Sequence, residues 1–439
     1  MRLRSPLVRL MTLVFVGALV AGLLVLVGMQ ALAQDDVPSQ TPYPTHTPYP
    51  TSTPYPTFTP PAGEAMTPGA EGETGDAPPL SDVEWTVENM TFTSHYPDGF
   101  EFSAEINSSA GPIVRGRVIW SHAPGTQRSR PVEVNPETGV VTSTWEVGIG
   151  EAIPPWVGIT YFWDVGDSEG NSFRTEPHYV EYEDDSHDWV RTESDDIIVF
   201  AQALPEDVNQ MTMDAMAEQR ETYRAAWGDL LPYKPRAILF GDRDAWLEWR
   251  VGFSNPRVIG QTSNDWGGTA QVVSGGDLVD LAYGTVLHEV AHLYQASFTI
   301  MTPGSWLIEG NATFFELNQQ YDYLETVRNL ARSGQLPVLL QGTGPGVSGQ
   351  NARRGYDVGY SFFRWLVDTH GIEAHRQFVE LLDTGTGRNE ALEIVTGLSV
   401  DEIESQWRVW LGASAVPPTL IPTPTLLVFP TPTPFSFGD

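Results

Sequence analysis

The chain of 439 residues contains no cysteine and a single lysine, Lys234. Without cysteine the protein has neither disulfide bonds nor thiolate metal ligands, so His, Asp and Glu are the side chains available for binding a metal ion. Basic residues are scarce as well: 24 Lys and Arg stand against 56 Asp and Glu, which gives a formal net charge of −32. A surface of this charge repels phosphate backbones and anionic lipid headgroups. We therefore expect no nucleic-acid partner.

The first 33 residues have the pattern of an export signal. Arg2, Arg4 and Arg9 precede an apolar run from Leu10 to Met29, which is followed by Ala31-Leu32-Ala33. This small-x-small ending is typical of a signal-peptidase site, whereas a run of about 20 residues is also long enough to span a bilayer. We predict either a cleaved signal peptide or a retained membrane anchor. The folded part is predicted to lie outside the cytoplasm of a bacterium, either secreted or anchored at the cell surface.

Two stretches are too rich in proline to form a core. Residues 34–81 contain three copies of the hexapeptide Thr-Pro-Tyr-Pro-Thr-x between positions 41 and 58, and residues 414–439 are rich in Pro and Thr. Alternating prolines keep a chain extended without internal hydrogen bonds. We predict a disordered stalk for the first stretch and a disordered tail for the second.

Residues 82–185 show the period-two alternation of half-buried strands. The clearest runs are Phe100 to Ile106, Val114 to Trp120 and Ile159 to Val165, and turn sequences rich in Pro, Gly, Asn and Asp separate them. About seven strands in about 100 residues are typical of a β-sandwich. The segment resembles immunoglobulin and fibronectin type III modules in its strand spacing and around Tyr161 to Val165, without the cysteine pair of immunoglobulin domains. We expect it to serve as a spacer or docking module.

Residues 186–413 have the pattern of an α+β domain. Helical periodicity runs from Glu206 to Trp227, a buried strand follows at Ala237 to Phe240, and most of the remainder is predicted to be helical. Ser399 and Glu402 form a capping-box pattern at the start of the last helix. The predicted fold class is therefore multidomain, with an all-β sandwich followed by an α+β domain.

The pattern that carries chemistry is an HExxH sequence, formed by His288, Glu289 and His292 within an apolar helical stretch. Residues four apart lie on the same face of a helix, so both imidazoles can face one metal ion, and zinc suits them. Glu289 lies about 100° further round the helix. There its carboxylate can act on a metal-bound water instead of binding the metal. A catalytic zinc site uses three protein ligands, so one more must follow.

The third ligand is expected in the next helix. The short metzincin spacing would place Gly at position 295 and His at position 298, but the chain has Gln295 and Phe298, which excludes that class. Glu309, within the segment from Ser305 to Glu316, offers a carboxylate from a second helix. It completes a His-His-Glu set of ligands.

This combination resembles the gluzincin metallopeptidases, and in detail the peptidase MA-like family, in which HExxH is followed by a W-x-x-E-G-x-A segment. Trp306, Glu309, Gly310 and Ala312 match that segment. The resemblance covers residues 190–413 and implies a gluzincin-like zinc metallopeptidase domain. It also implies a single Zn²⁺ ion in each chain and a peptide or protein substrate.

The resemblance suggests roles for further residues. Glu316 lies about two helical turns after Glu309, and we predict that it either accepts a hydrogen bond from a ligand histidine or forms a surface salt bridge. The family carries a Y-x-x-G tyrosine that donates a hydrogen bond to the oxyanion of the tetrahedral intermediate, and the segment from Tyr356 to Gly359 matches this pattern. Tyr360 is the competing residue. The alternative to both roles is that the two tyrosines merely pack beneath a helix from Tyr360 to Thr369.

The implied reaction is peptide-bond hydrolysis by a metal-activated water, with Glu289 carrying the proton from the water to the leaving amine. We expect the strand from Gly267 to Gln271 to pair with an extended substrate as an exposed edge strand. This strand lacks the glutamate with which aminopeptidase N relatives bind a free amino terminus, which favours an endopeptidase. The alternative function is that of a surface-displayed binding protein with a catalytically silent zinc-peptidase scaffold.

Two other features are predicted to be unrelated to the site. His370 and His375 flank a helix junction and are expected to be surface or capping residues. Asn311 begins an Asn-x-Thr sequence, but a glycan so close to Glu309 would block the cleft. We therefore do not expect a glycan on Asn311.

Overall fold

The computed structural model describes residues 83–122, 124–148, 151–250, 258–273, 277–297, 305–348 and 352–417. The predicted leader or anchor, the stalk and most of the predicted tail lie outside the described residues. Within these ranges no helix is long and apolar enough to cross a membrane.

The first part of the described chain contains two antiparallel sheets. One has the strand order β1-β2-β6-β5. Its strands are β1 (Trp85–His95), β2 (Gly99–Ser108), β5 (Glu133–Val134) and β6 (Val140–Glu146). Successive side chains of a strand point to opposite faces of its sheet. In β2, accordingly, Phe100, Phe102, Ala104 and Ile106 are buried, whereas the residues between them are only half-buried.

The second sheet has the order β4-β3-β7-β8, and β9 also pairs with β7. Its strands are β3 (Ile113–His122), β4 (Arg128–Pro131), β7 (Gly158–Asp167), β8 (Ser172–Arg174) and β9 (His178–Glu181). Because β8 and β9 pair with different ends of β7, together they form one interrupted edge strand. The two sheets share an apolar core, in which the ring centroids of Phe102 and Tyr161 lie 4.6 Å apart. We call this pair of sheets the β-sandwich.

A third, mixed sheet has the order β10-β11-β12-β14-β13. Its strands are β10 (Trp189–Glu193), β11 (Ile198–Gln202), β12 (Arg236–Phe240), β13 (Gly260–Ser263) and β14 (Gly268–Val272). The central strands β11, β12 and β14 run parallel, and each outer strand is antiparallel to its neighbour. All residues of the three central strands are buried, as expected for strands covered on both faces.

The prediction that Gly267 to Gln271 forms an exposed edge strand is wrong. This segment belongs to β14, which pairs with β12 on one side and with β13 on the other. On that side of the sheet the outer strand is β13, which precedes β14 in the chain. Alternation and burial predict strands, but they do not give the order in which strands pair, and this caused the error.

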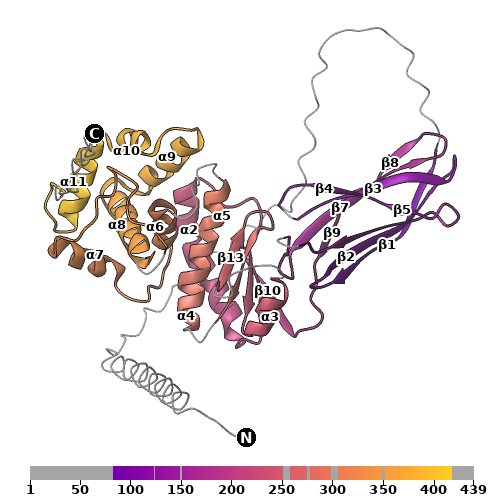
Figure 1. Cartoon of the computed structure of the whole chain (residues 1–439), viewed down its shortest axis with the longest axis horizontal. Coiled ribbons are helices and arrows are strands. Elements are labelled where there is room, and N and C mark those ends of the chain that lie inside the picture. The colour runs from indigo at the N-terminus through magenta and orange to yellow at the C-terminus, as the bar shows by residue number, and fades with distance from the viewer. Residues whose placement is uncertain are drawn as a thin grey trace, which may run out of the picture. The chain divides into compact units, whose positions relative to one another are not determined.

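Helices cover one face of the mixed sheet. They are α2 (Asp207–Trp227) and α5 (Val286–Ser297), with α4 (Leu278–Asp280) and the π-helical stretch η1 (Leu281–Thr285) leading into α5 (Figure 1). Along β11, Val199 and Ala201 pack with these helices. Ile198 and Phe200 belong instead to the core of the β-sandwich, together with Trp246 of α3 (Arg243–Glu248). The sandwich therefore packs directly against the mixed sheet.

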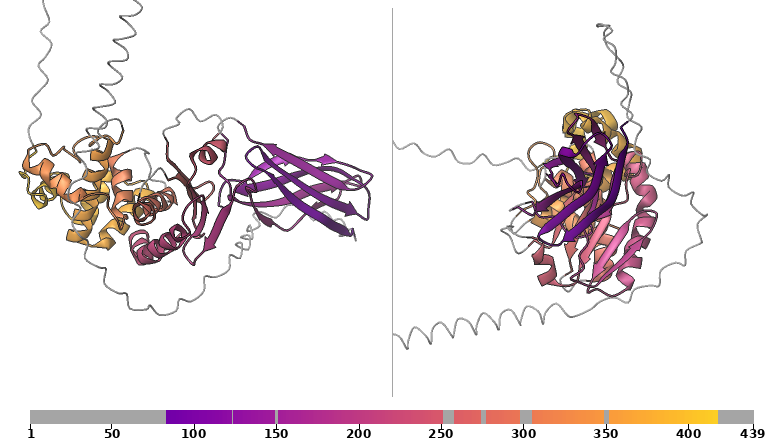
Figure 2. Two further views of the ribbon diagram at one scale, coloured as in Figure 1. Left: turned by 90° about the horizontal axis from the view of Figure 1, so that it is seen from below. Right: turned by 90° about the vertical axis from the view of Figure 1, so that its right-hand side faces the viewer.

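The remaining helices gather at the C-terminal end of the chain, orange to yellow in Figure 2. They are α6 (Trp306–Phe314), α7 (Tyr323–Arg332), α8 (Ala352–His370), α9 (Ile372–Asp383), α10 (Arg388–Thr396) and α11 (Val400–Trp410). The predicted capping box of Ser399 and Glu402 is confirmed at the start of α11. Helix α8 begins earlier than the predicted helix, so Tyr356 lies inside it and not before it.

Candidate metal centre

Helix α5 presents His288 and His292 on one face, with ring centroids 4.8 Å apart. The π-helical stretch before α5 leaves a backbone carbonyl outside the regular α-helical pattern, as π-bulges at functional sites often do. The carbonyl of Tyr283 accepts hydrogen bonds from the backbone N–H groups of Leu317 at 2.8 Å and Asn318 at 3.0 Å. The approach to α5 is thereby tied to the segment that follows α6.

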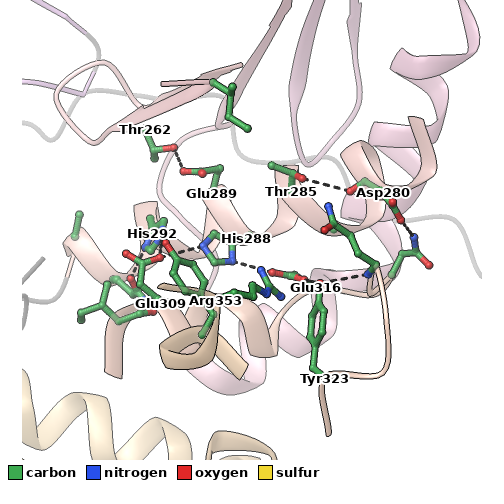
Figure 3. Close-up of a pocket in the computed structure, with 18 of the residues that line it drawn as sticks. Thr262, Asp280, Thr285, His288, Glu289, His292, Glu309, Glu316, Tyr323 and Arg353 are labelled. Atoms are coloured by element: carbon green, nitrogen blue, oxygen red, sulfur yellow. Dashed lines mark hydrogen bonds and ion pairs between the residues drawn. The ribbon is translucent and has the colours of Figure 1, made fainter. Parts of the chain in front are cut away.

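Helix α6 brings Glu309 to the two imidazoles. Ser305 caps the helix, and its hydroxyl accepts a hydrogen bond from the Ile308 N–H at 3.4 Å. Oε2 of Glu309 lies 3.4 Å from Nε2 of His288 and 3.5 Å from Nε2 of His292 (Figure 3). One ligand atom from each of the three side chains lies within 4.8 Å of the others, and the group could hold a metal ion.

A glycine pair places α6 against α8. A Cβ atom on Gly310 would collide with the backbone of Gly359, and a Cβ atom on Gly359 would collide with the backbone carbonyl of Trp306. The glycine after Glu309 in the W-x-x-E-G-x-A segment is therefore required by the close approach of two helices. The same contact places Tyr356 of α8 near Glu309.

Glu316 lies on the other side of His288. Its Oε1 is 3.0 Å from Nδ1 of His288, and its Oε2 accepts a hydrogen bond from the Tyr323 hydroxyl at 2.9 Å. The carboxylate thus contacts His288, one of the three residues that could bind a metal ion. Each imidazole turns Nε2 toward Glu309 while a second side chain contacts its Nδ1. This His-His-Glu set fits zinc.

The carboxylates around His288 favour a cation at the centre. Burial by itself would lower the pKa of His288, but the contacts with Glu309 and Glu316 raise it to about 10. Burial would raise the pKa of Glu309, yet the hydrogen bonds from His288 and His292 hold it well below its usual range. The negative charge of these carboxylates, which favours a proton here, would also favour a metal ion, because a proton and a metal ion compete for the Nε2 lone pairs.

A chain of buried polar groups begins behind His292. Nδ1 of His292 is 2.7 Å from Oε1 of Gln295, and Nε2 of Gln295 donates to the Ile308 carbonyl and to Oδ1 of Asn311, both at 2.9 Å. Because a backbone carbonyl only accepts hydrogen bonds, the amide nitrogen of Gln295 must face Ile308, and its oxygen must face His292. His292 therefore carries a hydrogen on Nδ1, which leaves Nε2 as the nitrogen that could bind a metal ion.

The hydrogen bonds at the far end of this series of buried polar groups also have one possible direction. Nδ2 of Asn311 lies 2.6 Å from Nε2 of His375, and Nδ1 of His375 lies 3.0 Å from the Ala226 carbonyl. Since that carbonyl accepts, Nδ1 carries the hydrogen and Nε2 accepts from Asn311. Burial lowers the pKa of His375 to about 4, so its ring is neutral. The prediction of His375 as a surface or capping residue is wrong, because its side chain is fully buried.

Replacing Gln295 with Leu is expected to weaken zinc binding about 10- to 100-fold. His292 would lose the acceptor that holds its hydrogen on Nδ1. Competition with a chromophoric chelator measures the affinity. Gln219→Leu is the matched control, because Gln219 is a buried amide that donates to the Phe315 carbonyl and does not contact a ligand. Equal zinc affinity in the two variants would contradict the role of Gln295.

Glu289 lies outside the group of metal-binding atoms found in the described residues. Its carboxylate accepts a hydrogen bond from the hydroxyl of Thr262 on the outer strand β13 (Figure 3). Thr262 carries no motif, and a contact between a strand and a helix distant in sequence has no local signal. The sequence therefore did not predict the role of Thr262, nor those of Gln295 and Asn311. For Gln295 a signal existed, since a residue three positions after His292 lies on the same helix face.

Tyr356 lies beside the metal-binding group. Its ring is nearly parallel to that of His288, with centroids 5.9 Å apart and an interplanar angle of 19°. Burial, the charge of Glu309 and a hydrogen bond to that carboxylate raise the pKa of Tyr356 well above its usual value, so the phenol stays protonated. Tyr360 packs against the ring of Tyr323 instead, at 5.8 Å. Of the two tyrosines, the geometry favours Tyr356 as a hydrogen-bond donor in the site.

These groups open into a cavity of about 740 Å³. Its wall includes the three residues that could bind a metal ion. Glu289, Tyr356, Arg353 and part of the β13 segment also line it. The guanidinium carbon atom of Arg353 lies 4.2 Å from the ring centroid of Tyr323. The cavity is large enough for a side chain and adjoining backbone of a peptide.

No family model matches the chain, and no curated protein matches it. An aminopeptidase N family protein from Idiomarina loihiensis is similar over 70% of this chain and 73% of its own, with 11% identity and a TM-score of 0.34. A GH family 64 laminaripentaose-producing β-1,3-glucanase from Paenibacillus barengoltzii is similar over 21% of this chain and 20% of its own, with 12% identity and a TM-score of 0.16. A purple acid phosphatase from yellow lupin seeds is similar over 56% of this chain and 48% of its own, with 11% identity and a TM-score of 0.19. These likenesses are too remote to bear on the function, which has to be argued from the site.

Proposed function

We propose that the protein is a zinc-dependent peptidase, and in particular an endopeptidase. The observation that carries this proposal is the convergence of His288, His292 and Glu309 in one cavity, with the Glu289 carboxylate beside them but outside the metal-binding group. In this assignment His288, His292 and Glu309 hold the zinc ion. When bound, zinc supplies a Lewis acid that polarises the scissile carbonyl and acidifies water.

Glu289 acts as general base and then as general acid. Its carboxylate takes a proton from the attacking water and returns it to the nitrogen of the leaving amine as the peptide bond breaks. The Thr262 hydroxyl donates a hydrogen bond to Oε2 of Glu289, and the Glu289 side chain lines the cavity. This contact supports the role, because a base has to be held in one orientation while the proton moves.

Tyr356 donates a hydrogen bond to the oxyanion of the tetrahedral intermediate. Its raised pKa supports this role, since a phenol that stays protonated can only stabilise negative charge as a donor. Burial and the charge of Glu309 are the main causes of that raised pKa.

We propose that the substrate binds along β13. This strand takes the place of the segment Gly267 to Gln271, which the sequence had suggested. β13 is the outer strand of its sheet, and an extended peptide can add to such an edge through backbone hydrogen bonds. Ile259, Thr262, Ser263 and Asn264 also line the cavity that holds Glu289. No glutamate occurs from Gly260 to Val272, which favours internal peptide bonds over capture of a free amino terminus.

For the two sheets before this domain, we infer an immunoglobulin or fibronectin type III type of sandwich. Lettered in chain order, their strands read A-B-E-D in one sheet and C′-C-F-G in the other, with G interrupted. The leader pattern supports a location outside the cytoplasm, either secreted or anchored. The zinc site then works where extracytoplasmic proteins or peptides are its substrates.

Chelation of the metal provides the test. The purified protein is expected to release fluorescence from quenched casein, to contain one zinc ion per chain, and to lose its activity with a zinc chelator and regain it with added zinc. The measurements are the cleavage rate and metal analysis of the same samples. Zinc without cleavage would favour the binding-protein alternative, and a protein without zinc would refute the proposal.

A further inference from the structure

β13, one of the two outer strands of the mixed sheet, is short and pairs with another strand on one side. We call β13, β14 and their turn, Gly260 to Val272, the edge hairpin. β13 has four residues and hydrogen-bonds to β14 alone among the strands of its sheet. An edge strand with one partner frays more readily than a central strand. Beyond its contacts with β14 and with helix α5, the position of β13 therefore depends on what holds the turn.

The β-sandwich holds the turn through one carboxylate. Oδ2 of Asp265 is 2.8 Å from Nδ1 of His122 and accepts a hydrogen bond from Nη2 of Arg128 at 2.9 Å. Oδ1 of Asp265 accepts a hydrogen bond from the backbone N–H of Thr126 at 3.2 Å. His122 ends β3 and Arg128 begins β4, so the three donors come from one loop of the sandwich and its two ends. We call His122, Thr126 and Arg128 the sandwich clamp.

The contact is closely fitted. A Cβ atom on Gly125 would collide with the carbonyl of Asp265. His122 is buried, and the guanidinium carbon of Arg128 lies 5.1 Å from the ring centroid of Trp120. Trp266, the next residue of the turn, is buried in the same core as Trp120. A single exposed ion pair stabilises little, but several donors held by buried neighbours fix the position of a carboxylate.

The clamped turn leads directly into the site. Thr262 lies three residues before Asp265 and donates its hydroxyl hydrogen bond to Glu289. The neighbouring residues Gln261 and Ser263 line a second cavity of about 610 Å³, whose other wall includes Trp120 and Arg128 of the sandwich. β13 thus lies between the cavity of Glu289 and the sandwich. A displacement of the turn would move Thr262 and the strand edge together.

We propose that the β-sandwich is a working part of the active site, because its clamp on Asp265 holds the edge hairpin where Thr262 orients Glu289 and β13 receives the substrate. This inference rests on the proposed peptidase function. It assigns positioning roles to Asp265, His122 and Arg128, none of which contacts the metal-binding group. It also replaces the expected spacer or docking role of the sandwich with a role in substrate positioning.

Asp265→Asn, compared with Asp164→Asn, provides the test. Asp164 accepts hydrogen bonds from Arg117 at 2.9 Å and Arg174 at 3.2 Å. These three residues form a similar carboxylate–arginine cluster in the same sandwich, but the cluster does not contact the edge hairpin. Three quantities are measured on the full chain: hydrogen exchange of the β13 amides, kcat and KM for a quenched casein peptide, and zinc content. Arg128→Gln, at a side chain that is 39% exposed, is the second variant if Asp265→Asn fails to fold.

In the Asp265→Asn protein we expect faster exchange in β13, unchanged zinc content, and a kcat/KM lower by about tenfold because the strand and Glu289 are misplaced. The Asp164→Asn protein should stay within about twofold of the wild type in all three measurements. Exchange as slow as in that control, or faster exchange with unchanged kcat/KM, would overturn the inference. If the wild type itself cleaves nothing, the proposed function fails, and β13 exchange still reports separately whether the clamp exists.

Discussion

Replacing Glu289 with Gln is expected to lower kcat by about 10³-fold while one zinc ion per chain remains bound. Glutamine has the size of glutamate and an oxygen that can accept the Thr262 hydroxyl, but its amide cannot take a proton from water. The side chain lies outside the metal-binding group, so zinc affinity should be unaffected. Initial rates with quenched casein and metal analysis of the same preparation measure both effects.

Glu380→Gln serves as the control for this substitution. Glu380 is an exposed carboxylate of α9 that interacts with Arg376 and does not line the cavity. It should retain wild-type kcat and zinc. Hydrolysis at the wild-type rate by the Glu289→Gln protein would show that another group moves the proton. Loss of zinc from that protein would place Glu289 among the ligands, against the geometry of the site.

Replacing Glu309 with Gln is expected to weaken zinc binding by more than about 100-fold, the upper range for residues that only support a ligand. The neutral amide removes the negative charge that faces both Nε2 atoms, at 3.4 Å from His288 and 3.5 Å from His292. Titration of the apoprotein with zinc against a chelator of known affinity gives the dissociation constant. Hydrolysis should fall in proportion to zinc occupancy.

Glu316→Gln is the informative comparison, because Glu316 contacts Nδ1 of His288 and not the Nε2 side where the metal would bind. Its effect on zinc affinity should be the smaller one, about 10- to 100-fold. If Glu316→Gln lost zinc as completely as Glu309→Gln, the distinction between ligand and supporting residue would be wrong. If Glu309→Gln bound zinc as tightly as the wild type, the third ligand would have to be another residue.

The sequence was sufficient to predict several features whose signal is local. The periodicity from Glu206 to Trp227 and the capping box of Ser399 and Glu402 depend on neighbours in the chain, and both predictions are confirmed. The HExxH spacing is equally local, because one helical turn separates His288 and His292. Glu309 and Glu316 lie on other segments, but the W-x-x-E-G-x-A pattern marked their region, and the structure brings both to His288.

The sequence was insufficient to predict contacts that depend on the order of strands in a sheet or on neighbours buried beside a residue. Thr262 reaches Glu289 because β13 is the outer strand of its sheet, and no pattern along the chain contains that order. His375 looks like a surface residue at a helix junction until α2 supplies the Ala226 carbonyl as its partner. In both cases the deciding atom belongs to a segment far away in sequence.

The close contact of Gly310 with Gly359 also determines which parts of the site are carried together. Glu309 and Tyr356 belong to two helices whose backbones touch, whereas His288, His292 and Glu289 belong to α5 on the other side of the cavity. The atoms that could bind a metal ion thus come from both groups of helices, and a cation held between them would join the two groups electrostatically. In the proposed peptidase, loss of the ion would remove more than a Lewis acid, since it would also remove the attraction that keeps Tyr356, the proposed oxyanion donor, in register with Glu289, the proposed base.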